Sequence, residues 1–294
     1  MQIRNKLATE SRYAMRYIWP TFILIGVVLV FPLLFSFIAS FMKWNLVPQS
    51  IKWVGLKNYS RIFSDSDTWH SIWLTLKYAS VSVAFEMLLG FIIASFLNID
   101  FRGNKIVRII VLMPMMLSPT IVSICWKFLL NYDRGAVNKI LEFMFGPQAK
   151  QVWLGKDWAF YAVMLVDVWV NTSFVVLNVL AGLQSVPLDV LEASKIDGAN
   201  SLQRTFHVTI PMIKPVLLVA LIFRTTFALR NFSITYVLTG GGPANYTWFY
   251  SLELYQEAFG KYHVGYASAL SWILIAVTFV FSVLYTKITM KGEN

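Results

Sequence analysis

The stretch LEASKIDGANSLQRTFHVTIPMIKP, residues 191–215, is a polar interruption between two long and largely apolar runs. Pro187 suits the first turn of a helix, and Gly198 can end that helix. Asn200 and Gln203 have the spacing of a capping box, which marks the start of a second helix. The stretch therefore predicts a compact helix–turn–helix on the surface of a membrane protein.

The composition indicates the same class of protein. Of the 294 residues, 57% are hydrophobic and only 14% are charged, with a mean hydropathy of +0.61. A soluble core cannot bury that much apolar surface, so the chain is expected to cross a membrane several times. The net charge of +10 is scattered through the loops. Lipid head groups are therefore the expected counterpart, and nucleic acid is not.

Six runs are long enough to cross a bilayer core, which needs about 20 apolar residues in a helix. They are residues 17–42, 73–97, 109–130, 158–183, 216–237 and 267–286. The basic residues before the first run resemble a secretory leader, but this run is too long and no A-x-A site follows it. We expect an all-α membrane protein, with one domain over residues 1–294 and the polar loop 184–214 between spans four and five.

The distribution of basic residues predicts the orientation in the membrane. Lys and Arg are denser in one alternate set of segments, residues 1–16, 98–108, 184–214 and 287–294, than in the opposite loops. Cytoplasmic loops carry this excess. Both termini and the polar loop are therefore expected in the cytoplasm.

Several kinds of catalytic site are missing from the sequence. It has no G-x-x-x-x-G-K-[ST] phosphate loop and no G-x-S-x-G elbow. The three histidines lack the spacing that would place two metal ligands on one helical face, and Cys125 is the single cysteine. We expect no enzyme activity, no metal site and no cofactor, so any energy must come from another subunit.

Several motifs appear in order along the chain. They are Glu192-Ala193-Ser194, Asp197-Gly198-Ala199, Ile210-Pro211, and the segments WVGLKNY (53–59), LQSVP (183–187), TGGGP (239–243) and GYASA (265–269). Together they resemble permease subunits of binding-protein-dependent ATP-driven (ABC) importers, in the carbohydrate-uptake branch that includes maltose-type permeases. Ser194 replaces the second alanine of the usual E-A-A motif, which is a mild departure.

The resemblance implies the type I ABC importer permease fold and a bacterial inner-membrane location. It implies four kinds of partner: a second, homologous permease in a heterodimer, two ATP-binding subunits, an extracytoplasmic solute-binding protein and a saccharide-like substrate. It also implies that the cytoplasmic loop contains a coupling helix that contacts the ATPase, through Glu192, Ala193, Ser194, Asp197, Gly198 and Ala199. Glu192 is expected to make a charged contact, Gly198 to form the turn, and Asp197 to hold the backbone amides of the turn.

Polar side chains at membrane depth indicate a substrate path, because they are costly there unless they are paired or functional. Arg224, Phe227, Ala228 and Asn231 are spaced to share one helical face. The resemblance to maltose-type permeases extends the expected path to Val170, Asn171 and Phe174. Aromatic rings beside amide and guanidinium groups suit a sugar.

Arg224 leaves two alternatives open. An unpaired guanidinium would favour an acidic substrate, such as a uronate oligosaccharide, a sulfosugar or a glycerol phosphate ester. Alternatively, Arg224 forms a structural ion pair with Asp167 or Glu86.

Other functional classes also have to be considered. A secondary transporter or channel subunit acting without an ATPase is the main alternative, but the sequence shows neither paired repeats nor broken helices. Nor does it show an activated nucleophile of the kind that a membrane-embedded enzyme needs.

Overall fold

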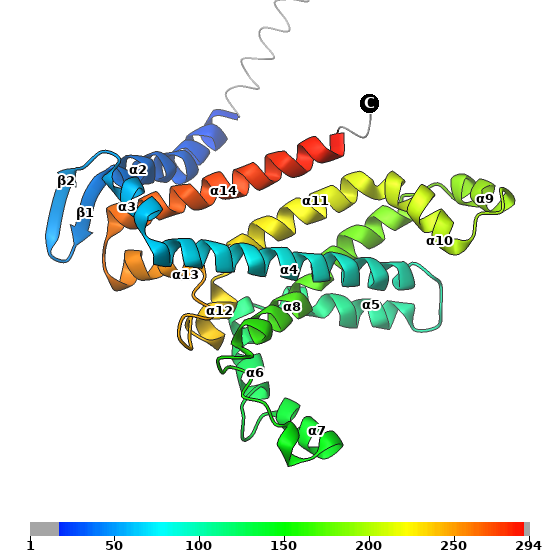
Figure 1. The fold of residues 1–294 in the computed structure, drawn as a ribbon. Coiled ribbons are helices and arrows are strands. Elements are labelled where there is room, and N and C mark those ends of the chain that lie inside the picture. The colour runs from blue at the N-terminus through cyan, green and yellow to red at the C-terminus, as the bar shows by residue number, and fades with distance from the viewer. Residues whose placement is uncertain (1–17, 291–294) are drawn as a thin grey trace, which may run out of the picture. The chain divides into compact units, whose positions relative to one another are not determined.

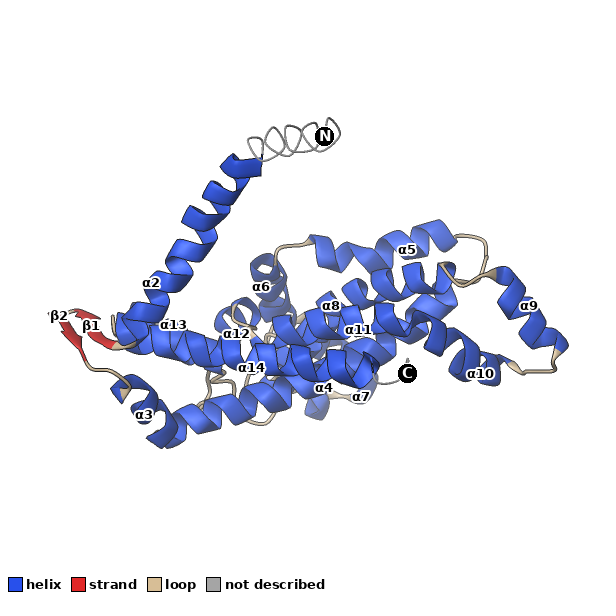
Figure 2. Ribbon diagram, turned by 90° about the horizontal axis from the view of Figure 1, so that it is seen from above, coloured by secondary structure: helices blue, strands red, loops and turns tan. Residues whose placement is uncertain are grey.

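The computed structural model describes residues 18–290, which are mostly helical (Figure 1, Figure 2). Tyr17, at the predicted start of the first span, and the N-terminal basic residues lie outside the described residues. Five described helices are long and apolar enough to cross a membrane, or six if one sharply bent pair counts as a single span. The described chain divides into two compact units, residues 18–65 with 254–273 and residues 66–253 with 274–290.

The first unit contains a span, a hairpin and a short helix. The span runs over Ile18–Ser40 and includes a π-helical segment, η1 (Gly26–Val30), followed by α2 (Phe31–Ser40). Its later elements are β1 (Met42–Leu46), β2 (Gln49–Trp53), α3 (Lys57–Ser64), η5 (Gln256–Gly260) and the first part of α14 (Val264–Met290). The two strands pair in antiparallel register. The mostly helical structure confirms the predicted all-α class, and this hairpin is a short departure from it.

Two contacts tie the first part of α14 to this unit. Trp272 packs edge-on against Phe37, with ring centroids 4.9 Å apart, and donates a hydrogen bond from its Nε1 to Ser36 Oγ at 3.2 Å. The guanidinium of Arg61 lies 4.3 Å from the centre of the Tyr266 ring. An aromatic face attracts a cation at this distance.

Glu257 anchors the loop that precedes α14. Its carboxylate accepts hydrogen bonds from Lys261 Nζ at 2.7 Å and pairs with His263 Nδ1 at 2.8 Å. Burial by itself raises the pKa of Glu257, but these two partners together outweigh burial and bring the pKa below its usual value.

The second unit is a helical bundle with extensions. Its elements are α4 (Ser66–Leu97), α5 (Asn104–Leu112), η2 (Met113–Met116), α6 (Pro119–Leu129), α7 (Ala136–Phe145), η3 (Pro147–Ala149), α8 (Ala159–Gln184), α9 (Leu188–Ile196), α10 (Ser201–Arg204), η4 (Thr205–Thr209), α11 (Ile210–Leu229), α12 (Ser233–Leu238), most of α13 (Tyr250–Tyr255) and the end of α14. Helices α4, α8 and α11 pack against one another, and α5 packs against α8 (Figure 1).

Small and β-branched residues form the centre of this bundle. Ala94, Val175, Val176 and Val179 are fully buried in the core between α4 and α8. Gly90 lets the two helices approach closely, because a Cβ atom placed there would lie 2.5 Å from Val175 Cγ1 and 2.6 Å from Val175 Cβ. Small residues at interhelical contacts are typical of membrane helices.

The third predicted span, 109–130, is broken rather than straight. The segment Asn104–Met116 meets Pro119–Leu129 at a bend of 102°. Ser118, the residue before Pro119, adopts an extended conformation with ψ of 131°, because a following proline disfavours the α region. Proline also removes a backbone donor from the helix. The sequence prediction overlooked this break.

The fifth span has different boundaries in the structure from the predicted ones, 216–237. The helical path starts earlier, since Ser201–Leu229 passes as one candidate span through α10, η4 and α11. It ends earlier too, because α11 stops at Leu229 and Ser233–Leu238 forms the separate helix α12. The second helix of the predicted helix–turn–helix is therefore the beginning of the fifth span.

Substituting Gly90 tests the close packing of α4 on α8. Gly90→Ala should lower the free energy of unfolding by about 1–3 kcal/mol through overpacking, although alanine is the better helix former. The measurement is thermal unfolding of the purified protein in detergent. Gly26→Ala is the matched control, because a Cβ atom at Gly26 meets nothing within 4 Å. Equal unfolding temperatures for the two variants would contradict the packing argument.

Candidate functional site

A cavity of about 400 Å³ lies within the second unit, where the bend before α6 faces α8 and the end of α11. Its lining combines amides, charged groups and aromatic rings. The lining residues are Met115, Leu117, Pro119, Asp167, Val170, Asn171, Phe174, Arg224, Phe227, Arg230, Asn231, Phe232, Ser233 and Ile234. All of the predicted path residues except Ala228 are among them.

Ala228 has a different place. It is 1% exposed and packs with Ala79, Val83 and Leu229 in the core between α4 and α11. The predicted four-residue face is also interrupted at its end, because α11 stops at Leu229 and Asn231 follows in the connection to α12. The middle of α8, the end of α11, the connection to α12 and the bend before α6 therefore form the cavity wall, rather than one continuous helical stripe.

Arg224 forms a buried ion pair with Glu86. Its Nε donates to Glu86 Oε2 at 2.6 Å and its Nη2 donates to Glu86 Oε1 at 2.9 Å. The residues are 2% and 0% exposed, respectively. The structure thus adopts the ion-pair alternative, and Arg224 does not present an unpaired positive charge to the cavity. This removes the basis for expecting Arg224 to bind an anionic substrate.

Asp167 completes the cluster from α8. Its Oδ2 lies 3.6 Å from Arg224 Nη2, and its Oδ1 accepts a hydrogen bond from Asn171 Nδ2 at 2.8 Å. Oδ2 receives no hydrogen bond from the part of the chain that the structure describes. Asp167 borders the cavity but is only 4% exposed, and Oδ2 is itself buried, so this carboxylate belongs to the ion-pair cluster rather than to the accessible wall of the cavity.

Two amides in the apolar spans, Asn231 of the predicted path and Asn178 of α8, have different roles in the structure. Asn231 donates to the hydroxyl of Tyr78 on α4, and its backbone carbonyl accepts from Ser251 Oγ. Asn178 donates to the carbonyl of Phe174 at 2.8 Å and is absent from the cavity lining. Asn231 therefore connects the cavity wall to α4, whereas Asn178 forms a hydrogen bond within its own helix, α8.

Three aromatic rings, those of Phe174, Phe223 and Phe227, contact one another in a row beside the cavity. The Phe174 and Phe223 centroids are 6.2 Å apart, and those of Phe223 and Phe227 are 6.3 Å apart. Phe174 and Phe227 line the cavity, so their rings can stack against an apolar face of a ligand.

Two residues of this site, Arg230 and Tyr78, were not among the predicted substrate-path residues. Arg230 lines the cavity with an exposed side chain that forms no ion pair with a described residue. Tyr78 is fully buried and holds Asn231. The stretch MLSPT, residues 116–120, was the available signal for the bend, because a proline inside an apolar run predicts a kink.

The predicted coupling residues lie in α9 and in the turn that follows it. This segment connects α8 to α11 and forms one end of the second unit (Figure 1). Gly198 has φ of +81° and forms the turn, as expected. Asn200 and Gln203 form the predicted capping box, with bonds of 2.8 and 2.9 Å. Ser194 is buried and donates to the carbonyl of Leu191.

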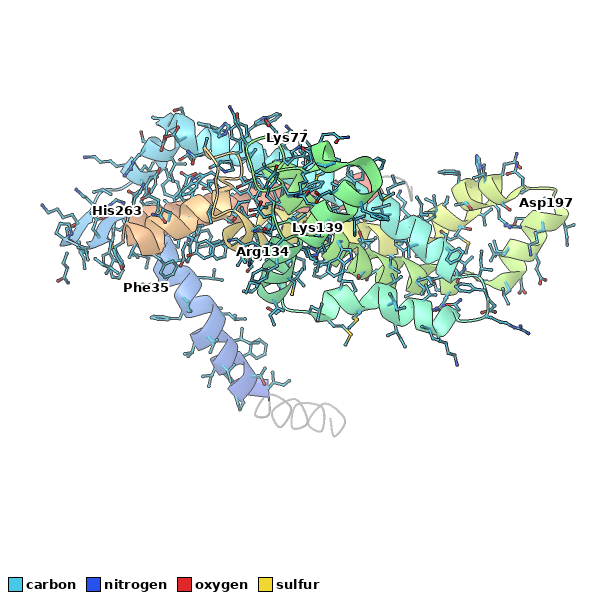
Figure 3. The ribbon with its side chains drawn as sticks, turned by 90° about the horizontal axis from the view of Figure 1, so that it is seen from below. Phe35, Lys77, Arg134, Lys139, Asp197 and His263 are labelled. Atoms are coloured by element: carbon cyan, nitrogen blue, oxygen red, sulfur yellow. The ribbon has the colours of Figure 1, made fainter. Side chains whose placement is uncertain are left out.

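The outer surface of this segment exposes two large apolar side chains among charged ones. Leu188 is 72% exposed and Ile196 is 86% exposed, whereas Leu191 packs against the bundle core. Asp197 lies at the tip of the turn, where Figure 3 labels it. The amides of the turn are held by the carbonyls of Ser194 and Lys195, and not by the Asp197 side chain as predicted.

Removing the buried cation tests the ion-pair cluster. Arg224→Ala should destabilise the fold by about 3–5 kcal/mol, because Glu86 would keep a buried and unpaired charge. The yield and the unfolding temperature of the purified protein measure this. Arg230→Ala is the control, since the same truncation at an exposed cation should change neither. A second variant, Glu86→Met with Asp167→Asn and Arg224→Met, removes all three charges of the cluster and should regain much of the loss. Wild-type stability of Arg224→Ala would contradict a structural role.

Comparisons with known proteins agree with the fold and with the motifs. Residues 86–290 match the family described as binding-protein-dependent transport system inner membrane component. The trehalose/maltose transport system permease protein MalF of Thermococcus litoralis is 38% identical over 283 residues, which cover 95% of this chain and 94% of the relative. The sulfoquinovosyl glycerol transport system permease protein SmoG of Agrobacterium fabrum is 31% identical, covering 92% of this chain and 87% of the relative.

A solved structure has the same fold. It is a bacterial alginate ABC transporter in complex with an alginate pentasaccharide-bound periplasmic protein. One chain of it superposes with a TM-score of 0.84 over 97% of this chain and 96% of its own length, at 20% sequence identity. From the family match and the two relatives we conclude that this chain belongs to the binding-protein-dependent inner membrane components. It is thus a multi-pass permease of an ABC importer, whose ATPase is a separate subunit.

Proposed function

We propose that this permease imports a saccharide delivered by an extracytoplasmic binding protein. The observation that carries the proposal is the cavity, where Phe174 and Phe227 offer ring faces beside the amide of Asn171. Sugars present apolar ring faces and rows of hydroxyl groups, so they need this combination. The similarity to a trehalose/maltose permease supports the same class of substrate.

An acidic saccharide is the narrower proposal, and it depends on a different residue from the one expected. Arg224 is engaged by Glu86, so Arg230 is the cation of the cavity lining that can receive a carboxylate or sulfonate. The similarity to a sulfoquinovosyl glycerol permease is compatible with such a substrate. Asp167 also borders this cavity, but its carboxylate is buried in the ion-pair cluster with Arg224.

The proposed assembly follows the type I importer plan. This chain would pair with a second, homologous permease, since residues 18–290 contribute six spans at most and one coupling segment. Two ATP-binding subunits would contact the α9–α10 segment on the cytoplasmic side, with both termini of the chain on that side. Glu192, Ala193, Ser194, Asp197, Gly198 and Ala199 would form the contact, with Leu188 and Ile196 as its exposed apolar surface. A transporter without an ATPase has no use for such a segment.

Substitution of one amide tests the substrate path. Asn171→Leu should lower ATP-driven saccharide uptake roughly tenfold in vesicles that contain the whole transporter, because one net hydrogen bond contributes about 1–1.5 kcal/mol. Asn178→Leu is the matched control, being the same change two turns further along α8 and outside the cavity lining. Neutral and uronate forms of one disaccharide are compared in the same assay. Equal uptake by both variants would contradict the path, and loss of uronate uptake alone in Arg230→Gln would support the acidic substrate.

Substitution of the turn glycine tests the coupling segment. Gly198→Val should uncouple ATP hydrolysis from uptake, because a β-branched residue is strained at φ of +81°, by about 1–2 kcal/mol. A Cβ atom at this position meets nothing within 4 Å, so the effect is conformational and not steric crowding. Gly198→Asn is the control, since asparagine tolerates a left-handed conformation. The measurement is the ratio of substrate imported to ATP hydrolysed, and an unchanged ratio in Gly198→Val would disprove the role of the turn.

A further inference from the structure

The β1–β2 hairpin has two chemically different faces. Its register pairs Met42 with Trp53 and Trp44 with Ile51, and these four side chains share one face because alternate residues of a strand point the same way. The other face carries Lys43 directly opposite Lys52. One face of the hairpin is thus apolar and the other is cationic.

The hairpin lies beside the end of the first span (Figure 1). It starts at Met42, two residues after α2 ends. The Trp44 ring contacts the Phe35 ring edge-on at 5.5 Å, and Figure 3 labels Phe35 on α2. Phe35 is five residues before the end of α2, which is about 7–8 Å along the helix axis. The apolar face of the hairpin therefore lies level with the last turns of a membrane-spanning helix.

The β2 half of this apolar face is exposed within the described chain, and the β1 half is partly buried. Ile51 is 54% exposed and Trp53 is 65% exposed. Trp53 stacks on Phe41, with ring centroids 5.8 Å apart. Tryptophan rings are enriched where hydrocarbon meets the lipid head groups. At this depth, the occupant that fits an exposed apolar face is the outermost part of the lipid acyl chains.

No described residue supplies a counter-ion to the cationic face. Like charges directly opposite each other destabilise a strand pair. Both lysines are exposed and neither forms an ion pair with a described residue. The carboxylate of Glu257, in the same unit, is engaged by Lys261 and His263. An external anion would therefore relieve the repulsion between the two lysines.

We propose that the β1–β2 hairpin binds an anionic phospholipid of the surrounding bilayer. Ile51 and Trp53 enter the boundary of the acyl chains, and Lys43 and Lys52 bind the phosphate of one head group between them. The charge complementarity and the depth of the hairpin together favour a lipid over a protein partner. This site is separate from the substrate cavity and does not depend on the proposed substrate.

Lipid retention tests the binding of the head group. The intact transporter is purified from bilayers of phosphatidylcholine and phosphatidylglycerol, and the lipids that it retains are counted by native mass spectrometry. The wild type should retain phosphatidylglycerol several-fold over its share in the bilayer, and Lys43→Gln with Lys52→Gln should lose this enrichment. The matched control, Lys105→Gln with Lys139→Gln, removes the same charge from exposed positions and should keep it. Unchanged enrichment in the hairpin variant, or equal loss in the control, would overturn the proposal.

A depth measurement tests the apolar face without relying on charge. Spin labels are attached at Ile51→Cys or Lys52→Cys in a Cys125→Ser background, with the transporter in bilayers. The label at residue 51 should be accessible to oxygen dissolved in the lipid, and the label at residue 52 to a water-soluble nickel complex. Nickel access at both positions would place the hairpin in water and overturn the proposal. Protection of both labels by the binding protein would identify a protein-docking surface instead, and would overturn it as well.

Discussion

The ion-pair cluster of Glu86, Arg224 and Asp167 is the constraint on which the second unit depends. The three residues come from α4, α11 and α8, and each is at most 4% exposed. Burying any one of these charges alone would be very unfavourable, so each requires the others in place. Every arrangement of these three helices must therefore keep the cluster together, and this determines which faces of α4, α8 and α11 meet.

The cavity exists because two helices stop beside this cluster. The chain bends at Leu117 and Ser118, before α6, and α11 ends at Leu229. Irregular backbone at membrane depth is tolerated where it is buried in protein or lines a water-filled cavity, since its polar groups must find partners. Both breaks contribute lining residues. The breaks thus supply polar groups to the cavity, while the ion pair holds its wall in position.

In the proposed importer, the route from the ATPase to the cavity would be short and mostly helical. The helical path Ser201–Leu229 begins three residues after the Gly198 turn and carries Arg224 near its other end. Displacement of the turn would therefore reach the ion-pair cluster through one element rather than through a series of loops. Rigid-body movement of packed helices is a common way for such switches to act.

The sequence by itself determined the class of protein, the family and the chemistry of the turn. Hydropathy predicted the membrane spans, and the capping box of Asn200 and Gln203 and the turn at Gly198 formed as predicted, because these features depend on local interactions. The sequence also identified all three charged residues of the cluster as membrane-depth groups. It left open whether Arg224 is paired with this chain or with a ligand.

Only the tertiary structure decided that question, because residues 86 and 224 are far apart in the chain and meet only when α4 and α11 pack. The tertiary structure also showed that Ala228 is buried against α4 and does not line the cavity beside its neighbours. It further showed that Arg230, and not Arg224, is the cation that a ligand in the cavity can reach. A helical repeat predicts which residues share a face. It does not predict where the helix ends or which neighbour covers that face, and these two facts determine which side chains reach the cavity.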